Sequence, residues 1–294
     1  MKEMSEEFLS YMTEVKKSSR NTVLSYKNDI NKLIHHLEKL NIKDVSRINE
    51  TCINSYILSM EREGLSPATV SRNIAVIKAF VLFLIKKGKI HEDPTERLKA
   101  PKVEKKPPTC LSLKEIESLL SMPNTNINKG IRDKAMLELL YATGIRVSEL
   151  ITLDIANVNL KSKYIICSYS GRERIIPFGN TTKDALVDYI DNVRSKILNE
   201  KESNYLFTNM LGEPMTRQGF WKVLKGYGKS AGIVEELKPQ MLRNSFALHL
   251  IDNGADIYSV QELLGHLDVS TTQGYLQKRN KRLLDVYLKT HPRL

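Results

Sequence analysis

The sequence predicts a mainly α-helical protein of two domains, the second of which contains a small antiparallel β-sheet. Residues 1–100 carry only apolar spacings typical of helices. Residues 101–108, PKVEKKPP, mix proline with lysine and cannot form a regular element, which indicates a linker. Residues 163–179, KYIICSYSGRERIIPFG, place two β-branched runs around Ser-Gly, the pattern of a β-hairpin. We therefore expect domains at 1–100 and 110–294, with the linker over 101–109 between them.

Two helices are marked clearly in the first domain. In residues 18–40, apolar side chains recur at helical spacing at Val23, Tyr26, Ile30, Leu33 and Leu37. A second helix begins with Ser66 as its N-cap and Pro67 at its first position, because the fixed φ of proline suits a first turn. This helix is expected to end at Gly88.

The second domain opens with a capping box, in which Ser112 and Glu115 are spaced to bond each other's backbone N–H groups. A helix through RDKAMLELLYAT then stops at Gly144, which leaves Arg146 at the start of the next short helix. Further helices follow the expected hairpin, and one of them begins at Pro239.

Two helices also meet within residues 263–275, LLGHLDVSTTQGY. The first ends at Gly265, so His266 lies just past a helix C-terminus, which favours a protonated imidazole. The S-x-x-Q spacing that starts at Ser270 is a capping box for the second helix, whose first turns carry Tyr275.

Four side chains on these elements suit one chemistry. Taken singly, Arg146 and Arg243 also fit solvated surface charges, and His266 and Tyr275 fit structural roles. Together they are what attack on a phosphodiester requires, because a phenol with a pKa of about 10 needs a positive field to become a nucleophile. Guanidinium groups then bind the charge that gathers on the non-bridging oxygens. Such a site needs no metal ion, the sequence shows no cluster of acidic residues, and no cofactor is expected.

Positive charge extends along the whole chain. Residues 1–109 hold 20 Lys and Arg against 14 Asp and Glu, the remainder holds 25 against 20, and the net charge is +11. This distribution suggests a polyanion that both domains contact, although basic proteins without such partners are common.

The location expected for the chain is the cytoplasm. Cys52, Cys110 and Cys167 are odd in number and form no CxxC pair, which favours reduced thiols and argues against a zinc site. The N-terminus lacks the apolar run of a signal peptide. The most apolar stretch, residues 73–88, is interrupted by Lys78 and is too short to cross a bilayer, so no membrane contact is expected.

Three segments together resemble the tyrosine recombinase (phage integrase) family, and within it the Xer-like members. They are ATGIRVSEL, RERIIPFG and PQMLRNSFALHLIDNGADIYSVQELLGHLDVSTTQGY, in their spacing along the chain. The stretch SPATVSRNIAVIKAFVLFLIKKGKIHEDPT also resembles that family's helical core-binding domain. The resemblance implies a SAM-like helical bundle followed by a catalytic domain, which form a C-shaped clamp around double-stranded DNA.

In that family a tyrosine attacks the scissile phosphate and gives a 3′-phosphotyrosyl link and a free 5′-hydroxyl, which then attacks a partner strand. Carried over to this chain, the resemblance makes Tyr275 the nucleophile. It makes Arg146 and Arg243 the phosphate ligands, and it gives His266 a further contact to the phosphate.

Two positions depart from the family pattern. The family usually has histidine where this chain has Gln240, which can donate a hydrogen bond but cannot exchange a proton. Its hairpin usually reads GKGxKxR, with the first lysine acting as the acid toward the leaving 5′-oxygen, and alignment on RERIIP puts Tyr169 there. Arg172, Lys161 and Lys163 are nearby substitutes, of which Arg172 offers charge but no proton. Losing a general acid typically lowers a rate roughly 10²–10⁴-fold.

DNA contacts are expected from both domains, with Arg20, Lys27 and Arg72 as candidates in the first, although each also fits an ordinary solvated charge. Near the C-terminus, one helical side collects the apolar residues Leu283, Leu284, Tyr287 and Leu288. In the family such a helix docks into a neighbouring protomer, and four protomers assemble on two DNA sites. A homo- or hetero-tetramer on paired DNA sites is therefore expected, and docking of the tail onto its own chain is the alternative.

Three functions compete at this point. The first is a site-specific recombinase for DNA integration or recombination, such as the resolution of chromosome or plasmid dimers. The second is a catalytically weak or silent DNA-binding partner that positions an active recombinase, which the departures at Gln240 and Tyr169 would favour. The third, a basic helical protein unrelated to DNA, requires every motif above to be a coincidence.

Overall fold

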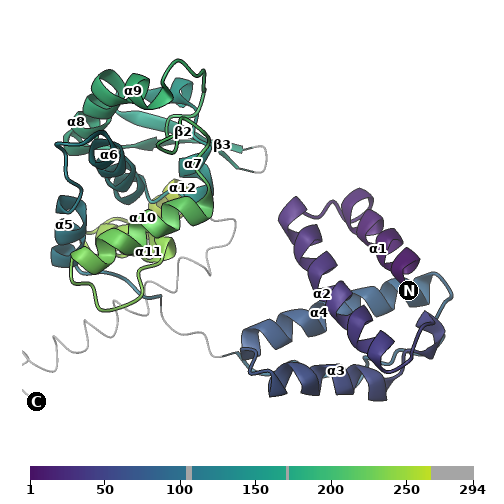
Figure 1. The fold of residues 1–294 in the computed structure, drawn as a ribbon. Coiled ribbons are helices and arrows are strands. Elements are labelled where there is room, and N and C mark those ends of the chain that lie inside the picture. Colours follow the sequence, from purple (N-terminus) through teal and green to yellow (C-terminus); the bar gives the residue numbers. More distant parts are fainter. Residues whose placement is uncertain (104–107, 170–171, 266–294) are drawn as a thin grey trace, which may run out of the picture. The chain divides into compact units, whose positions relative to one another are not determined.

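The computed structural model divides the chain into two compact units, Met1–Lys105 and Lys106–Leu294. It describes residues 1–103, 108–169 and 172–265, and of Tyr169 and Arg172 it describes the backbone only. Helices dominate both units, and a three-stranded antiparallel sheet lies in the second (Figure 1). The expected fold class, mainly helical with one small sheet, is confirmed.

Four α-helices form the first unit around its own hydrophobic core. They are α1 (Lys2–Glu14), α2 (Arg20–Lys39), α3 (Glu50–Arg62) and α4 (Pro67–Lys86), with the 3-10 turn η1 (Val45–Arg47) before α3. Side chains cap three of the helices: Ser19 accepts from Thr22 N–H, Asn49 accepts from Cys52 N–H, and Ser66 accepts from Thr69 N–H.

α4 is the most apolar of these helices. It is 20 residues long and contains an 18-residue apolar window with a mean hydropathy of 1.7, so its length and composition would allow it to cross a membrane. The expectation that this stretch is too short was wrong, because the helix begins at Pro67, well before the apolar run at 73–88. Half of that apolar window is buried, and α4 packs against α1, α2 and α3, which is the environment of a core helix.

The second unit contains the sheet and most of the shorter helices. Its elements are α5 (Leu113–Ser121), α6 (Asn128–Thr143), α7 (Val147–Ile151), η2 (Ile155–Asn157), β1 (Val158–Asn159), β2 (Tyr164–Tyr169), β3 (Arg172–Pro177), α8 (Asn180–Tyr189), the π-helical turn η3 (Ile190–Arg194), α9 (Ser195–Leu198), α10 (Arg217–Ser230), α11 (Pro239–Asp252) and α12 (Ile257–Leu264). The predicted capping box at the start of α5 is present, since Ser112 and Glu115 bond each other's backbone N–H groups.

The predicted hairpin is confirmed in β2 and β3, which pair antiparallel in the order β1-β2-β3. Alternation gives the sheet one buried face, on which Ile165 and Ile176 are paired and fully buried. Ile175, the neighbour of Ile176, is 63% exposed on the opposite face. Cys167 pairs with Arg174 in the same register, so the Arg174 side chain lies on the buried face too.

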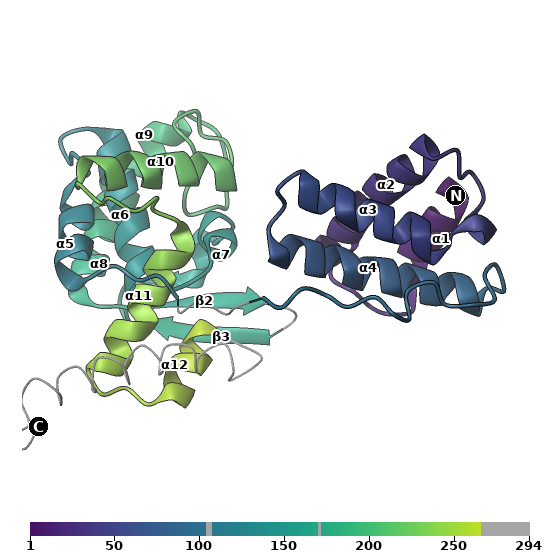
Figure 2. The ribbon, with the colours of Figure 1, turned by 90° about the horizontal axis from the view of Figure 1, so that it is seen from below.

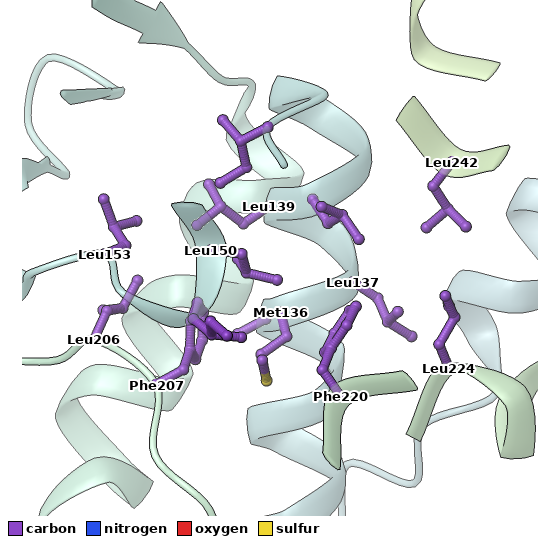
Figure 3. Close-up of a cluster of buried hydrophobic side chains, with 14 of the residues drawn as sticks. Met136, Leu137, Leu139, Leu150, Leu153, Leu206, Phe207, Phe220, Leu224 and Leu242 are labelled. Atoms are coloured by element: carbon purple, nitrogen blue, oxygen red, sulfur yellow. The ribbon is translucent and has the colours of Figure 1, made fainter. Parts of the chain in front are cut away.

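α6 runs through the main core of this unit (Figure 3). Its residues Met136, Leu137 and Leu139 are completely buried. Around them lie Leu150 and Leu153 after α6, Leu206 and Phe207 from the loop before α10, Phe220 and Leu224 of α10, and Leu242 of α11. A smaller cluster joins α11 and α12, and α12 also packs against β3 (Figure 2).

Candidate active site

Arg146 lies at the N-cap of α7, directly after a left-handed turn. Gly144 makes that turn with a φ of 58°, as predicted, and a Cβ there would lie 2.3 Å from Phe246 of α11. Only glycine therefore allows the end of α6 to approach α11 this closely. The turn buries Ile145 and leaves the Arg146 side chain 29% exposed.

Arg243 is held inside the unit, on α11. It is 2% exposed, and its guanidinium donates from Nη1 to Gly144 O and from Nη2 to Leu264 O. These bonds connect α11 to the ends of α6 and α12. A solvated surface charge, one of the two interpretations of this arginine, is excluded by this burial.

One pocket brings the two arginines together. It has a volume of about 360 Å³, and Arg146, Arg243 and Gln240 are among the residues that line it. Arg217, the first residue of α10, lines it as well, and sequence reasoning missed this residue. Three arginines and one glutamine thus line a common space, a composition that suits an anion with several oxygens.

Gln240 is oriented by its neighbour on α11. Its amide Nε2 donates to Asn244 Oδ1 at 3.0 Å, and Asn244 Nδ2 donates to Thr109 O at 3.1 Å. One turn along the helix, Ser245 Oγ accepts from Leu111 N–H at 2.8 Å. Thr109, the last residue of the expected linker, and Leu111 just after it therefore anchor the helix that carries Gln240 and Arg243.

Three arginines converge on the C-terminal end of α12. Arg174 Nε donates to Leu263 O at 3.0 Å, Arg243 Nη2 donates to Leu264 O, and Arg146 Nη2 donates to Gly265 O at 3.3 Å. The carbonyls of a helix C-terminus carry partial negative charge, so cations stabilise them. Gly265 ends this helix in the left-handed region with a φ of 62°, as predicted.

Glu149 links two of these arginines. Arg174 Nη1 and Nη2 donate to its two carboxylate oxygens, each at 2.9 Å, while Arg146 N–H donates to Oε2 at 2.7 Å. Burial alone would raise the pKa of Glu149, but hydrogen bonds from Arg174 and from the Arg146 N–H, with both guanidinium charges, hold that pKa below its ordinary value. The carboxylate therefore stays ionised, although its side chain is only 7% exposed.

Two predicted catalytic residues, His266 and Tyr275, lie outside the described residues. Tyr169 and Arg172 pair in the backbone register of the hairpin, as the last pair before residues 170–171 that connect the two strands. Lys163 Nζ donates to Asn180 Oδ1 at 3.0 Å, and Lys161 lines a different pocket, beside β1.

The candidate DNA contacts of the first unit lie on α2 and α4. Arg20 and Lys27 are exposed on α2. Arg72, half exposed on α4, donates to Ser25 Oγ at 2.8 Å and to Asp29 Oδ1 at 3.0 Å, so it is held by two partners on α2.

Sequence reasoning also missed Glu149 and Arg174. Both stand in quoted segments, ATGIRVSEL and RERIIPFG, but nothing in the spacing shows that the two segments meet. In the part of the chain that the structure describes, no three His, Cys, Asp or Glu side chains are grouped as a metal ion requires.

Comparison with known proteins gives matches along the whole chain. The profile "Phage integrase family" matches residues 109–282, and "Phage integrase, N-terminal SAM-like domain" matches residues 5–88. Tyrosine recombinase XerD of Staphylococcus haemolyticus is 40% identical over 294 residues, and that of Listeria innocua is 40% identical over 296 residues. Both alignments cover 100% of this chain and 100% of the relative.

Solved structures show the same fold. XerA recombinase is 27% identical with a TM-score of 0.56, and the match covers 100% of this chain and 99% of that one. XerH recombinase in a post-cleavage complex with a palindromic difH substrate is 20% identical with a TM-score of 0.77, over 96% of this chain and 83% of that one.

Proposed function

The chain belongs to the phage integrase family as an Xer-like tyrosine recombinase, and from this premise we propose that it recombines DNA at specific sites through a 3′-phosphotyrosyl intermediate. The observation that carries the proposal is the pocket lined by Arg146, Arg243 and Gln240. Planar guanidinium groups bind phosphate oxygens in pairs, and a partly enclosed site strengthens that attraction. The full-length similarity to relatives named tyrosine recombinase XerD supports the same function.

In the proposed reaction, Tyr275 Oη loses its proton and attacks the scissile phosphorus. The new bond joins Oη to phosphorus on the 3′ side, and the bond from phosphorus to the 5′-oxygen breaks. The 5′-oxygen takes up a proton and leaves as a hydroxyl, which attacks a phosphotyrosine on a partner strand in the reverse sense. Arg146 and Arg243 stabilise the charge on the non-bridging oxygens, and His266 contributes a hydrogen bond or a proton relay.

The donors at the two departing positions act differently in this scheme. Gln240 contributes a hydrogen bond to the phosphate and no proton transfer. Tyr169 occupies the position of the family's lysine, where a neutral phenol can donate a proton but has a pKa far from the optimum. The replacements at Gln240 and Tyr169 therefore make cleavage slow in this scheme. Arg172, in the hairpin itself, supplies positive charge but no proton.

Binding to DNA involves basic residues of both units in this proposal. Arg20, Lys27 and Arg72 contribute phosphate contacts from the first unit, and Arg217 contributes one beside the scissile phosphate. We further propose a cytoplasmic protein that assembles as a tetramer on paired DNA sites. The segment with Leu283, Leu284, Tyr287 and Leu288 docks into the neighbouring protomer in this arrangement.

A nicked suicide duplex tests the chemistry directly, because cleavage beside the nick releases a short fragment and traps the covalent adduct. We expect an adduct with the full chain and none with Tyr275→Phe. Tyr258→Phe is the matched control, since Tyr258 is a tyrosine on α12 that is 69% exposed, and this variant should still form the adduct.

This assay, together with a measurement of duplex binding at several salt concentrations, separates the competing functions. Duplex binding without adduct from the unmodified chain would identify a silent DNA-binding partner and overturn the proposed cleavage. Affinity for duplex that does not fall steeply between about 50 and 200 mM salt would instead indicate a protein unrelated to DNA.

A further inference from the structure

We infer that Arg174 is a positioning residue for strand cleavage, which orients Arg146 through Glu149 and fixes the end of α12. This inference rests on the proposed function and adds a residue that acts at one remove from the phosphate. It is drawn from the contacts that Arg174 makes on two sides, toward α7 and toward α12.

The contact toward α7 is a two-pronged ion pair. Arg174 Nη1 and Nη2 each lie 2.9 Å from one oxygen of Glu149, with side-chain exposures of 11% for Arg174 and 7% for Glu149. A guanidinium fork fixes a carboxylate in both position and rotation, which a single ammonium group does not. Arg174 therefore determines where the Glu149 oxygens lie.

Glu149 in turn holds Arg146 at two points. Its Oε2 accepts from Arg146 N–H at 2.7 Å, and its Oε1 lies 3.5 Å from Arg146 Nη1. The first contact fixes the start of α7, and the second directs the guanidinium. Arg146 lines the candidate phosphate pocket, so the position of Arg174 is transmitted to that pocket in two steps.

The contact toward α12 is equally close. Arg174 Nε donates to Leu263 O at 3.0 Å, and a Cβ placed on Gly265 would lie 2.9 Å from Arg174 Nη1. The Arg174 guanidinium thus packs directly against the last turn of α12, from which the chain continues to His266. The Arg174 side chain on β3 therefore contacts both the residue that positions Arg146 and the helix end that precedes the segment with Tyr275.

A purely structural arginine offers a matched control in the same unit. Arg194, in η3, donates from Nε to Leu206 O at 3.3 Å and from Nη2 to Ser203 O and Tyr205 O at 2.6 and 2.8 Å. Like Arg174, it satisfies backbone carbonyls. Its carbonyl partners belong to the loop before α10, and these bonds involve neither Arg146 nor Glu149.

The experiment compares Arg174→Lys, Glu149→Gln and Arg194→Lys with the unmodified chain on nicked suicide duplexes. Single-turnover cleavage is measured at saturating protein, together with half-site affinity and thermal unfolding. We expect Arg174→Lys and Glu149→Gln to bind half-sites within about twofold of the unmodified chain but to cleave about 10- to 100-fold more slowly, because small misplacements of a catalytic group have effects of this size. Arg194→Lys should cleave within about twofold of the unmodified chain at equal occupancy.

A substrate with a neutral methylphosphonate at the scissile position provides the readout that a structural role would not move. It carries one charged oxygen fewer, so it depends less on a well-placed Arg146. The cleavage defect of Arg174→Lys should shrink on this substrate, whereas a defect caused by unfolding would not. Normal cleavage by folded Arg174→Lys, or a defect equal on both substrates, would overturn the inference while leaving the proposed function intact. Absence of adduct from the unmodified chain would overturn both.

Discussion

Arg146 donates a hydrogen bond of 3.3 Å from Nη2 to Gly265 O, although 119 positions separate the two residues in the chain. Leu264 O, one peptide earlier, accepts from Arg243. Both proposed phosphate ligands therefore contact the backbone immediately before His266. Any displacement of the end of α12 changes the environment of both guanidinium groups, which makes this helix end a sensitive place for substitution.

Substitution of Gly265 tests that sensitivity. Gly265→Ala introduces a Cβ at a φ of 62° and 2.9 Å from Arg174 Nη1, so the arginine must move. Gly232→Ala is the control, since Gly232 has a φ of 71° but open space around it. Chemical denaturation should show that Gly232→Ala lowers the free energy of unfolding by about 1–2 kcal/mol, the usual cost of an alanine in the left-handed region. Gly265→Ala should lower the free energy of unfolding more than this and should also cleave more slowly. An equal decrease in the two variants would show that the Arg174 side chain can move aside without destabilising the fold.

Substitution of the two arginines that line the pocket should change the free energy of unfolding by different amounts. Arg243→Ala removes the donor to two buried carbonyls, those of Gly144 and Leu264, at about 1–3 kcal/mol for each group left without a partner. Arg146→Ala removes a side chain that is 29% exposed and should lower the free energy of unfolding much less. Both variants should lose adduct formation. If the two variants have equal free energies of unfolding, other donors must bond the carbonyls of Gly144 and Leu264 in Arg243→Ala.

The elements that local spacing controls were the most predictable. The stops at Gly144 and Gly265, the capping box at Ser112 and the hairpin were all correctly predicted, because each depends on residues a few positions apart. The length expected for the apolar stretch of α4 was wrong, because apolar composition alone does not show where a helix begins.

Contacts between segments that are far apart in the chain could not be predicted from the sequence. The resemblance singled out Arg146 and Arg243, and the structure brings them to one pocket. It did not reveal that Arg174 reaches Glu149, since that contact depends on how β3 packs against α7 and α12.

Acid should weaken the Glu149 network. Because the pKa of this carboxyl is held below its ordinary value of 4.5 in the folded chain, its contribution to stability is complete above that value and is lost as the pH falls through the folded pKa. The difference in free energy of unfolding between the unmodified chain and Glu149→Gln should therefore be larger at pH 6 than at pH 3. Urea denaturation at both pH values measures it, and a difference independent of pH would contradict the expectation.

Restoring the family's histidine should accelerate cleavage. Gln240→His places a group that exchanges protons near neutral pH beside Arg146 and Arg243, where a general acid–base group typically contributes roughly 10²–10⁴-fold. We expect faster single-turnover cleavage of the suicide duplex, with a pH dependence near neutral pH that differs from that of the unmodified chain. Gln218→His, the same change on the exposed face of α10, is the control and should leave the rate unchanged. An unchanged rate in Gln240→His would mean that proton transfer at this position does not limit cleavage.

Arg72 should contribute one phosphate contact from the first unit. Its guanidinium is anchored by Ser25 and by Asp29, whose side chain is 4% exposed, so the arginine is held in place before DNA arrives. Arg72→Ala should weaken half-site binding uniformly across sequences and reduce the slope of log K against log salt by about 1. Arg62→Ala, which removes the same charge from the exposed end of α3, is the control for net charge alone. Filter binding at several salt concentrations measures both slopes, and equal changes in the two variants would show that Arg72 acts only through the overall charge of its unit.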